Sequence, residues 1–171
     1  MAIHEIVKYN PINYLNGVYI TEEWSSKSDI GKIFNGHKFT INEYMQTERE
    51  YIDAVKIIMH TVHSKCLTIS YTEVDLDHTL MSIKNSPHYE FDKHLTSIIP
   101  YIYVGSEIPI TQIDTVIQLC LIEYAYIELQ DLSHNLQISF GYDYYMKINT
   151  MLSKQKIENL LKGLKLYVDP R

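Results

Sequence analysis

The spacing of apolar side chains predicts one long amphipathic helix in the first half of the chain. Between residues 41 and 62, apolar residues recur every three or four positions, and charged residues largely occupy the opposite face. Thr40 precedes this segment, and Glu43 follows Thr40 by three positions, which is the sequence pattern of a capping box. We therefore expect the helix to begin directly after Thr40 and to pack its apolar face against a sheet.

Alternation of apolar and polar residues predicts the strands of that sheet. Residues 67–72 alternate at a period of two, and we interpret them as its first strand. The C-terminal third predicts an antiparallel meander, with a turn at residues 133–135 and a break at Gly141. The three strands of the meander are expected at residues 124–132, 136–140 and 144–148.

Shorter patterns fill the rest of the chain. We expect a short helix within residues 86–95, a strand at 101–104 and a second helix at 111–122. Ser153 is expected to cap a last helix that stops at Gly163 and leads into an edge strand near residues 164–168. Residues 1–27 are expected to be less regular, and the stretch of residues 9–17 is expected to wrap the domain. The fold class is therefore α+β: a central antiparallel sheet packed by several helices, in one domain that spans residues 1–171.

Composition narrows the class of protein. The chain has 171 residues, of which 46% are hydrophobic and 21% charged, as in an ordinary globular domain. Its formal net charge of -6 repels phosphate backbones and favours basic partners, so we expect no direct binding to nucleic acid. The first residues lack the pattern of a secretory signal, and no stretch is apolar enough to cross a bilayer. We therefore expect a cytoplasmic protein with no membrane contact.

Residues that carry chemistry are present but do not form a recognised catalytic pattern. Cys66 and Cys120 each lie at the edge of an apolar segment and are expected to be buried thiols. His60 and His63, three positions apart, match no metalloprotease motif. The chain has no nucleophile elbow, no phosphate-binding glycine loop and no dinucleotide fingerprint. We therefore expect no catalytic residue, no bound metal and no cofactor, and the protein is predicted not to be an enzyme.

Tyrosine is the residue type that stands out. The chain has 15 tyrosines, several of them around residues 124–126 and 142–145. Tyrosine offers a large apolar area with a polar tip and is enriched in protein interfaces. If residues 142–145 are extended, Tyr142 and Tyr144 share one side of the strand and Tyr145 takes the other. The same side chains are equally suited to fill the core between sheet and helices.

Three segments resemble contact-dependent growth inhibition immunity proteins. They are SDIGKIFNGHKFTINEYM from Ser28, IQLCLIEY from Ile117 and FGYDYYMKI from Phe140, and the likeness covers most of the chain past Trp24. The resemblance implies a small cytoplasmic protein that binds and neutralises the C-terminal toxin domain of a matching effector. The subgroup it is most similar to guards against nuclease toxins and binds by strand addition, in which a toxin hairpin extends the antiparallel sheet of the immunity protein.

The resemblance leads to a hypothesis about the binding residues. An acidic surface would attract the basic surface that a nuclease needs for its own substrate. We assign five residues to a toxin-binding pocket or its rim: Tyr126, Glu128, Tyr142, Asp143 and Tyr144. We further expect Asp75 and Asp77, in a turn after the predicted first strand, to contact Lys or Arg of the toxin.

Two alternative functions are open at this point. The first is a small metal-dependent hydrolase that uses Asp77, His78, His88 and His94, if the fold brings them together. The Asp75 to His78 stretch gathers three potential ligands, although a turn after a strand has the same composition for conformational reasons. The second is an adaptor subunit of a larger complex, which differs from an immunity protein mainly in the identity of its partner.

Overall fold

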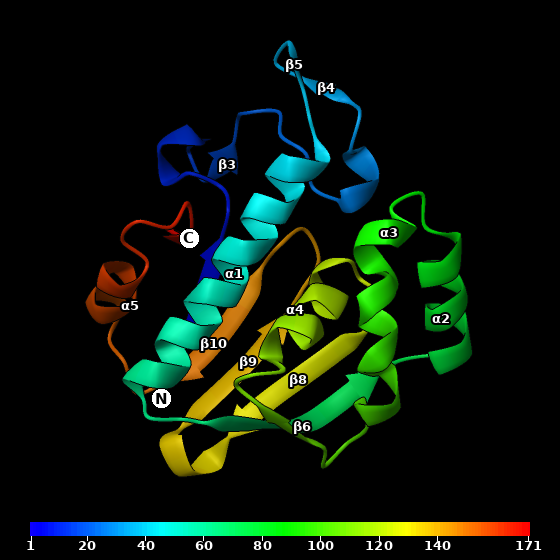
Figure 1. Ribbon diagram of the computed structural model, residues 1–171. Coiled ribbons are helices and arrows are strands. Elements are labelled where there is room, and N and C mark those ends of the chain that lie inside the picture. The colour runs from blue at the N-terminus through cyan, green and yellow to red at the C-terminus, as the bar shows by residue number, and fades with distance from the viewer.

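A seven-stranded antiparallel sheet forms the centre of the molecule. The computed structural model describes residues 1–171, and its strand order is β11-β1-β10-β9-β8-β6-β7 (Figure 1). Every neighbouring pair is antiparallel. The strands are β1 (Ala2–Val7), β6 (Cys66–Glu73), β7 (Glu107–Pro109), β8 (Tyr126–Asp131), β9 (Leu136–Phe140), β10 (Met146–Thr150) and β11 (Tyr167–Val168). The predicted α+β class is confirmed.

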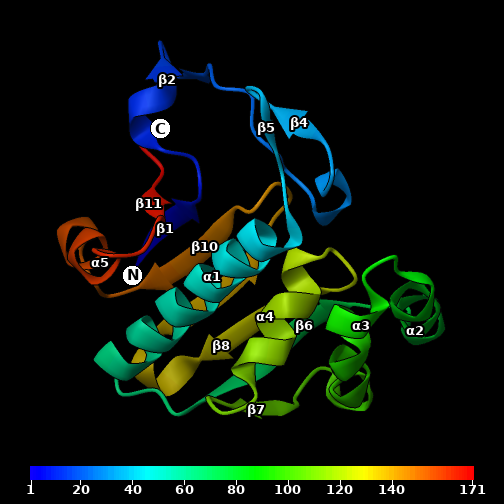
Figure 2. The ribbon, with the colours of Figure 1, turned by 45° about the horizontal axis from the view of Figure 1, so that its top comes forward.

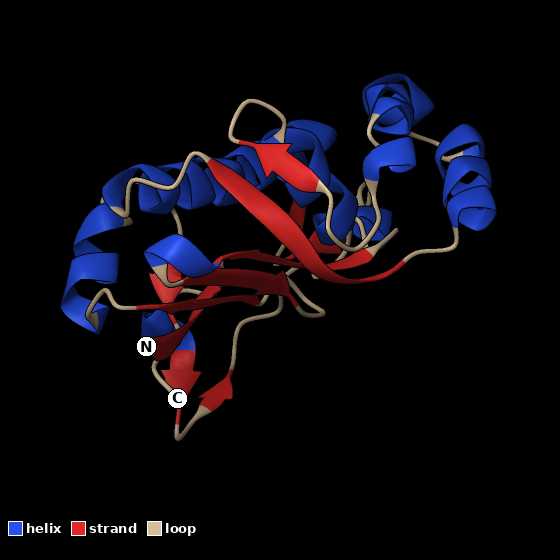
Figure 3. Cartoon of the chain, turned by 90° about the horizontal axis from the view of Figure 1, so that it is seen from below, coloured by secondary structure: helices blue, strands red, loops and turns tan.

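The chain has five α-helices, and the two that run across the sheet lie on the same face of it. They are α1 (Ile41–Thr61), α2 (Leu76–Asn85), α3 (Tyr89–Asp92), α4 (Ile113–Leu121) and α5 (Lys154–Leu160). Short 3-10 turns complete the chain: η1 (Pro11–Asn13), η2 (Lys27–Asp29), η3 (Lys93–Ser97), η4 (Ile99–Tyr101) and η5 (Leu132–His134). Helices α1 and α4 cover one face of the sheet and leave the other uncovered (Figures 2 and 3). No helix combines the length and apolarity that crossing a membrane requires.

The core lies between the sheet and helices α1 and α4. Strand residues such as Ile69, Leu129 and Ile138 point toward the helices and are almost completely buried. On the helix side, Val55 and Ile117 are fully buried in the same cluster. Burying one such side chain contributes roughly 1.5–3 kcal/mol, so this layer supplies the main driving force for folding.

The strongest local signals are confirmed. The Thr40 hydroxyl accepts a hydrogen bond from the Glu43 N–H at 3.3 Å, and the Glu43 carboxylate accepts from the Thr40 N–H at 2.8 Å, so the capping box forms and α1 begins at Ile41. Strands β8, β9 and β10 form the predicted meander. Helix α4 lies inside the predicted 111–122 segment, Ser153 caps α5, and β11 lies at one edge of the sheet.

Several predictions are wrong. Residues 67–72 form a strand as predicted, within β6, but it is not the first strand of the sheet, because β1 precedes it in the chain. Residues 101–104 are not a strand: η4 ends at Tyr101, and the N–H of Gly105 donates to the carbonyl of Ile69 at 2.8 Å. The sheet instead ends with β7. Residues 75–78 are not a turn but the start of α2, and only α3 and η3 form within the predicted 86–95 helix.

The N-terminal arm, residues 8–39, holds two small hairpins and is tied together by a buried lysine. The hairpins pair β2 (Tyr14–Leu15) with β3 (Val18–Tyr19) and β4 (Ile33–Phe34) with β5 (His37–Lys38). The Lys8 ammonium lies 4.2 Å and 4.3 Å from the ring centres of Tyr9 and Trp24, and 3.2 Å from the Glu23 carboxylate. Burial lowers the pKa of Lys8, and Glu23 opposes that shift. Lys8 therefore ties the arm together through cation–π contacts and one ion pair. The arm contacts the body through Trp24, whose ring centre lies 5.0 Å from that of Tyr144.

Candidate functional site

The uncovered face of the sheet carries polar and aromatic side chains. Along β8, Ile127 and Leu129 point into the core, so Tyr126 and Glu128 point outward. On β6, a bulge changes the alternation: the register shifts between Ile69 and Tyr71. Because the bulge adds one residue, Tyr71 and Glu73 turn to the uncovered face instead of the core. Without the bulge, a tyrosine would enter the apolar layer.

Four of these residues form a tyrosine–glutamate cluster: Tyr71, Glu73, Tyr126 and Glu128. Tyr71 lies opposite Glu128 and Glu73 opposite Tyr126 in the β6–β8 register. The Tyr126 hydroxyl donates to the Glu128 carboxylate at 2.8 Å, and the Tyr71 hydroxyl donates to Glu73. The two rings meet edge to face with centres 6.0 Å apart. They remain 43% and 38% exposed for Tyr71 and Tyr126, so the cluster presents aromatic area to solvent.

Both phenols of the cluster are protonated at physiological pH. Partial burial, together with the hydrogen bond to Glu128, raises the pKa of Tyr126 to about 12. The hydrogen bond to Glu73 raises the pKa of Tyr71. Both hydroxyls therefore remain hydrogen-bond donors at physiological pH, and the negative charge of the cluster resides on its two glutamates.

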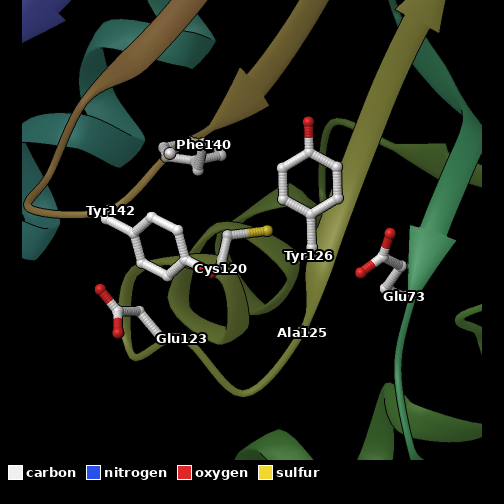
Figure 4. A pocket seen from close by; sticks show the side chains of 8 residues that line it. Glu73, Cys120, Glu123, Ala125, Tyr126, Phe140 and Tyr142 are labelled. Atoms are coloured by element: carbon white, nitrogen blue, oxygen red, sulfur yellow. The ribbon is translucent and has the colours of Figure 1, made fainter.

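A pocket of about 290 Å³ adjoins the cluster (Figure 4). Its lining consists of Glu73, Cys120, Glu123, Ala125, Tyr126, Phe140, Gly141 and Tyr142. Cys120, Ala125 and Phe140 are buried and provide an apolar base. The rings of Tyr126 and Tyr142 lie on the two sides of Cys120, and the carboxylates of Glu73 and Glu123 lie farther out, on opposite sides of the pocket.

The pocket is acidic and contains no cation. None of its lining residues is a lysine or arginine, and no ion pair involves Glu73, Glu123 or Glu128. Burial raises the pKa of the Cys120 thiol to about 12, so this sulfur is neutral and a poor nucleophile. The chemistry of the pocket favours binding a cationic group over covalent catalysis.

Glu123 occupies a position that favours glycine. Its φ is 59°, in the left-handed region, at the end of α4. The Glu123 N–H donates to the carbonyl of Cys120 at 3.0 Å and the Tyr124 N–H to that of Leu119 at 3.1 Å, which is a Schellman motif with Glu123 in the glycine position. Its negative charge also lies at the negative end of the helix dipole. The left-handed conformation and the unfavourable helix dipole both lower the stability of the fold. The pocket nevertheless has a carboxylate at this position.

The predicted arrangement of Tyr142 and Tyr144 on one side of a strand is wrong. Residues 142–145 form a tight turn, with φ of 54° at Asp143 and 64° at Tyr144 and a 3.2 Å hydrogen bond from the Tyr145 N–H to the Tyr142 carbonyl. This is the geometry of a type I′ turn. Tyr142 is 80% exposed, whereas Tyr144 is only 4% exposed. The turn therefore separates the two rings.

Tyr144 belongs to the core and does not lie in the pocket. Its ring centre lies 5.0 Å from that of Trp24 and 6.0 Å from that of Tyr51, and its carbonyl accepts a hydrogen bond from the Tyr51 hydroxyl. These contacts hold the hairpin tip in place. Asp143 is exposed at that tip. Burial lowers the pKa of Lys8 and raises that of Tyr9, and the negative charge of Asp143 opposes the first shift and adds to the second.

The structure does not bring Asp75 and Asp77 into the pocket. The Asp75 carboxylate accepts a hydrogen bond from the His78 N–H at 2.9 Å and caps α2. Asp77 is exposed in the first turn of the same helix. Of the seven predicted site residues, Tyr126 and Tyr142 line the pocket and Glu128 lies beside it. Sequence reasoning missed Glu73 and Glu123, which supply its charge.

The residues of the hydrolase alternative are not gathered into a metal site. Within residues 1–171, no three His, Cys, Asp or Glu side chains form a group that could hold a metal ion. His94 instead lies 2.9 Å from the Gln118 side chain.

Another pocket, of about 670 Å³, lies at the opposite end of β6. It is lined in part by Cys66, Asp131 and His134. The Asp131 carboxylate accepts from the Ser64 hydroxyl and lies 2.7 Å from the His134 ring. Burial and the neighbouring Glu107 and Asp131 raise the pKa of Cys66, so its thiol is also neutral. Asp131 caps η5, and these contacts stabilise the turn between β8 and β9.

No protein-family model, no curated protein and no solved structure matches this chain. The site is therefore interpreted from its own geometry and charge.

Proposed function

We propose that this chain is a protein-binding module that captures a basic partner, and that it acts by binding and not by catalysis. The observation that carries the proposal is the acidic pocket and the adjoining tyrosine–glutamate cluster. Together they place three glutamates without a cationic partner, Glu73, Glu123 and Glu128, among exposed tyrosine rings. Tyrosine provides contact area at little entropic cost, and unpaired carboxylates attract Lys and Arg. The binding needs no cofactor.

The particular function we propose is immunity against a contact-dependent growth inhibition toxin. The partner is then the C-terminal toxin domain, and its activity is that of a nuclease. Two of the three segments that resemble such immunity proteins meet at the pocket: residues 117–124 contribute Cys120 and Glu123, and residues 140–148 contribute Phe140, Gly141 and Tyr142. The third segment, residues 28–45, contributes Phe39 and Tyr44, which pack around Trp24 behind the hairpin tip.

The charge of the chain supports this choice of partner. A net charge of -6 speeds the encounter with a basic nuclease, and a bound acidic protein covers the surface that the nucleic acid would use. Such a protein would act in the cytoplasm, where a delivered nuclease meets its substrate. An adaptor role would use the same surface with a different partner.

Strand addition needs a free edge near the pocket. β8 is unsuitable because it pairs with β6 and β9 along both sides. β7 pairs only with residues Cys66 to Thr68 of β6, so the second half of β6, from Tyr71 to Glu73, has no strand on its outer side. We propose that a toxin strand adds to this edge, directly beside the tyrosine–glutamate cluster.

The test is purification of the chain together with the toxin domain encoded immediately upstream of its gene, followed by a nuclease assay. We expect a stable complex and loss of nuclease activity. Glu128→Lys should weaken toxin binding by at least about tenfold, because it reverses charge at the cluster. Glu158→Lys makes the same change at an exposed position on α5 and should bind normally. Absence of any complex would refute the proposed function, and equal affinity of the two variants for the toxin would refute the assignment of the binding site to the cluster.

A further inference from the structure

We propose that the acidic pocket receives one arginine side chain of the partner, with its guanidinium stacked against a tyrosine ring of the pocket and drawn there by the carboxylates of Glu73 and Glu123. The identity of the partner rests on the proposed function. The choice of arginine rests on the pocket itself.

The size of the pocket fits one long side chain. A volume of about 290 Å³ corresponds to roughly ten water molecules at about 30 Å³ each. This is too small to contain a hairpin or a helix, so a partner segment that docks here can insert only a single residue. The apolar base of Cys120, Ala125 and Phe140 suits the methylene stem of such a residue, because long cationic side chains bury their stems against apolar surface.

The walls of the pocket favour a guanidinium over an ammonium. Two carboxylates lie on opposite sides of the pocket, and two aromatic rings lie between them. A guanidinium is planar, stacks on aromatic faces and carries five N–H donors in a fixed fork, so it can lie on a tyrosine ring and still donate to a carboxylate at the edge of that ring. An ammonium is a compact, strongly hydrated charge with no planar face to stack on the rings.

The two glutamates retain free acceptor atoms for this purpose. Glu73 accepts one hydrogen bond, from the Tyr71 hydroxyl, and keeps its second oxygen. No hydrogen bond to the Glu123 carboxylate is formed within the chain, and its position at the end of α4 opposes both backbone conformation and helix dipole. A bound cation would compensate the charge at that helix end.

The same molecule holds one of its own arginines with this combination of groups. The guanidinium of Arg171 binds both oxygens of Asp169, at 2.8 Å and 3.0 Å, and lies 5.4 Å and 5.6 Å from the ring centres of Tyr14 and Tyr145. One carboxylate and two tyrosine rings therefore suffice to bind a guanidinium here. The acidic pocket offers two tyrosine rings and two carboxylates, without a cation of the chain itself.

The first arm of the test uses the isolated protein and small probes. N-acetyl-arginine methylamide, the corresponding lysine compound and the uncharged norleucine compound are titrated while backbone amide shifts are recorded by NMR. We expect the arginine probe to shift the amides of Glu123, Gly141 and Tyr142 with a Kd on the order of millimolar. Glu73→Gln combined with Glu123→Gln should abolish the shifts, whereas Glu158→Gln should retain them. Equal binding of the norleucine probe, tighter binding of the lysine probe, or no shift in these amides would overturn the assignment.

The second arm separates the pocket from the proposed function. Toxin affinity is compared among the wild type, Glu73→Gln, Glu123→Gln and Glu158→Gln. We expect about a tenfold loss for each pocket variant, larger at low salt, and none for the control. If the wild type and the pocket variants bind the toxin with equal affinity, the arginine site is refuted and the immunity function stands. Arginine-probe binding without any toxin complex would refute immunity while the site stands.

Discussion

Glu123→Gly should stabilise the fold and weaken partner binding at the same time. The left-handed conformation of residue 123 costs a side-chain-bearing residue about 1–2 kcal/mol relative to glycine. Removing a carboxylate from the negative end of α4 raises the free energy of unfolding by about 0.3–1 kcal/mol. The greater conformational freedom of glycine in the unfolded chain lowers the free energy of unfolding by about 0.5–1 kcal/mol. The net expectation is a gain of about 1 kcal/mol in the free energy of unfolding.

The assay is thermal unfolding followed by circular dichroism. For a chain of this size, about 1 kcal/mol raises Tm by roughly 2–4 °C. Glu123→Gln keeps the unfavourable backbone conformation and removes only the charge, so its Tm should rise by less than that of Glu123→Gly. The rise should be smaller still at high salt, because salt screens the charge. The end of α5 offers a comparison within the molecule, because Gly163 already occupies the left-handed region there with φ of 97°.

The result that would refute this reasoning is a Tm for Glu123→Gly equal to or below that of the wild type. Such a result would mean that the Glu123 side chain makes a stabilising interaction in the free protein. A raised Tm with unchanged toxin affinity would instead support the backbone argument and separate it from the binding role of the carboxylate.

Three further predictions concern the packing of the core, the stability of the fold at acidic pH and the reactivity of the two thiols. Tyr144→Ala should lower the free energy of unfolding in urea by about 3–5 kcal/mol, and Tyr144→Phe, which keeps the ring, by less than about 1 kcal/mol; equal losses would mean that ring packing is not what holds the turn. Hydrogen bonds from Arg171 lower the pKa of Asp169 below its ordinary value of 3.8, so their stabilisation is present above that pH and is lost as the pH falls through the lower folded value. Asp169→Asn should therefore flatten the fall of Tm below about pH 4, and an identical slope would contradict this. Iodoacetamide at pH 8 should label Cys66 before Cys120, because Cys120 is the more deeply buried and the pKa of its thiol is raised to about 12; peptide mass spectrometry showing the reverse order would contradict the burial.

The elements that the sequence predicts well are those with local signals. Helix α1 is specified by apolar spacing and by the Thr40–Glu43 capping box, whose members are three positions apart. The meander is specified by alternation within β8, β9 and β10 and by short connections. Each of these patterns is complete within a few residues, so tertiary structure adds little information.

β1 could not be recognised from local pattern. Its inward position holds His4, whose ring lies 2.9 Å from the carbonyl of Leu152, and its outward position holds the exposed Ile3. The apolar and polar sides are thus the reverse of what alternation would assign at these two residues. Only the distant hydrogen-bond acceptor makes a histidine acceptable on the inner face.

The pocket escaped prediction for similar reasons. The bulge at Ser70 turns Glu73 to the uncovered face, and bulges have no reliable sequence signal when no glycine is present. The type I′ turn around Asp143 and Tyr144 lacks the usual Asn-Gly or Asp-Gly pair, so residues 142–145 resemble a strand. Tyr126 and Tyr142 were found because exposed tyrosines are typical of interfaces. The acidic partners depended on tertiary geometry.

The place of β1 in the sheet determines when the chain can fold. β1 is synthesised early but lies between β10 and β11, and the contact from His4 to Leu152 spans 148 positions. Until β10 leaves the ribosome, β1 has no neighbour, and the apolar layer beneath α1 stays open to chaperones and proteases. Pairing across such long separations is also slow. Under the immunity function proposed above, a cell would therefore be protected by molecules that had already folded, and a burst of new synthesis would contribute only after a delay.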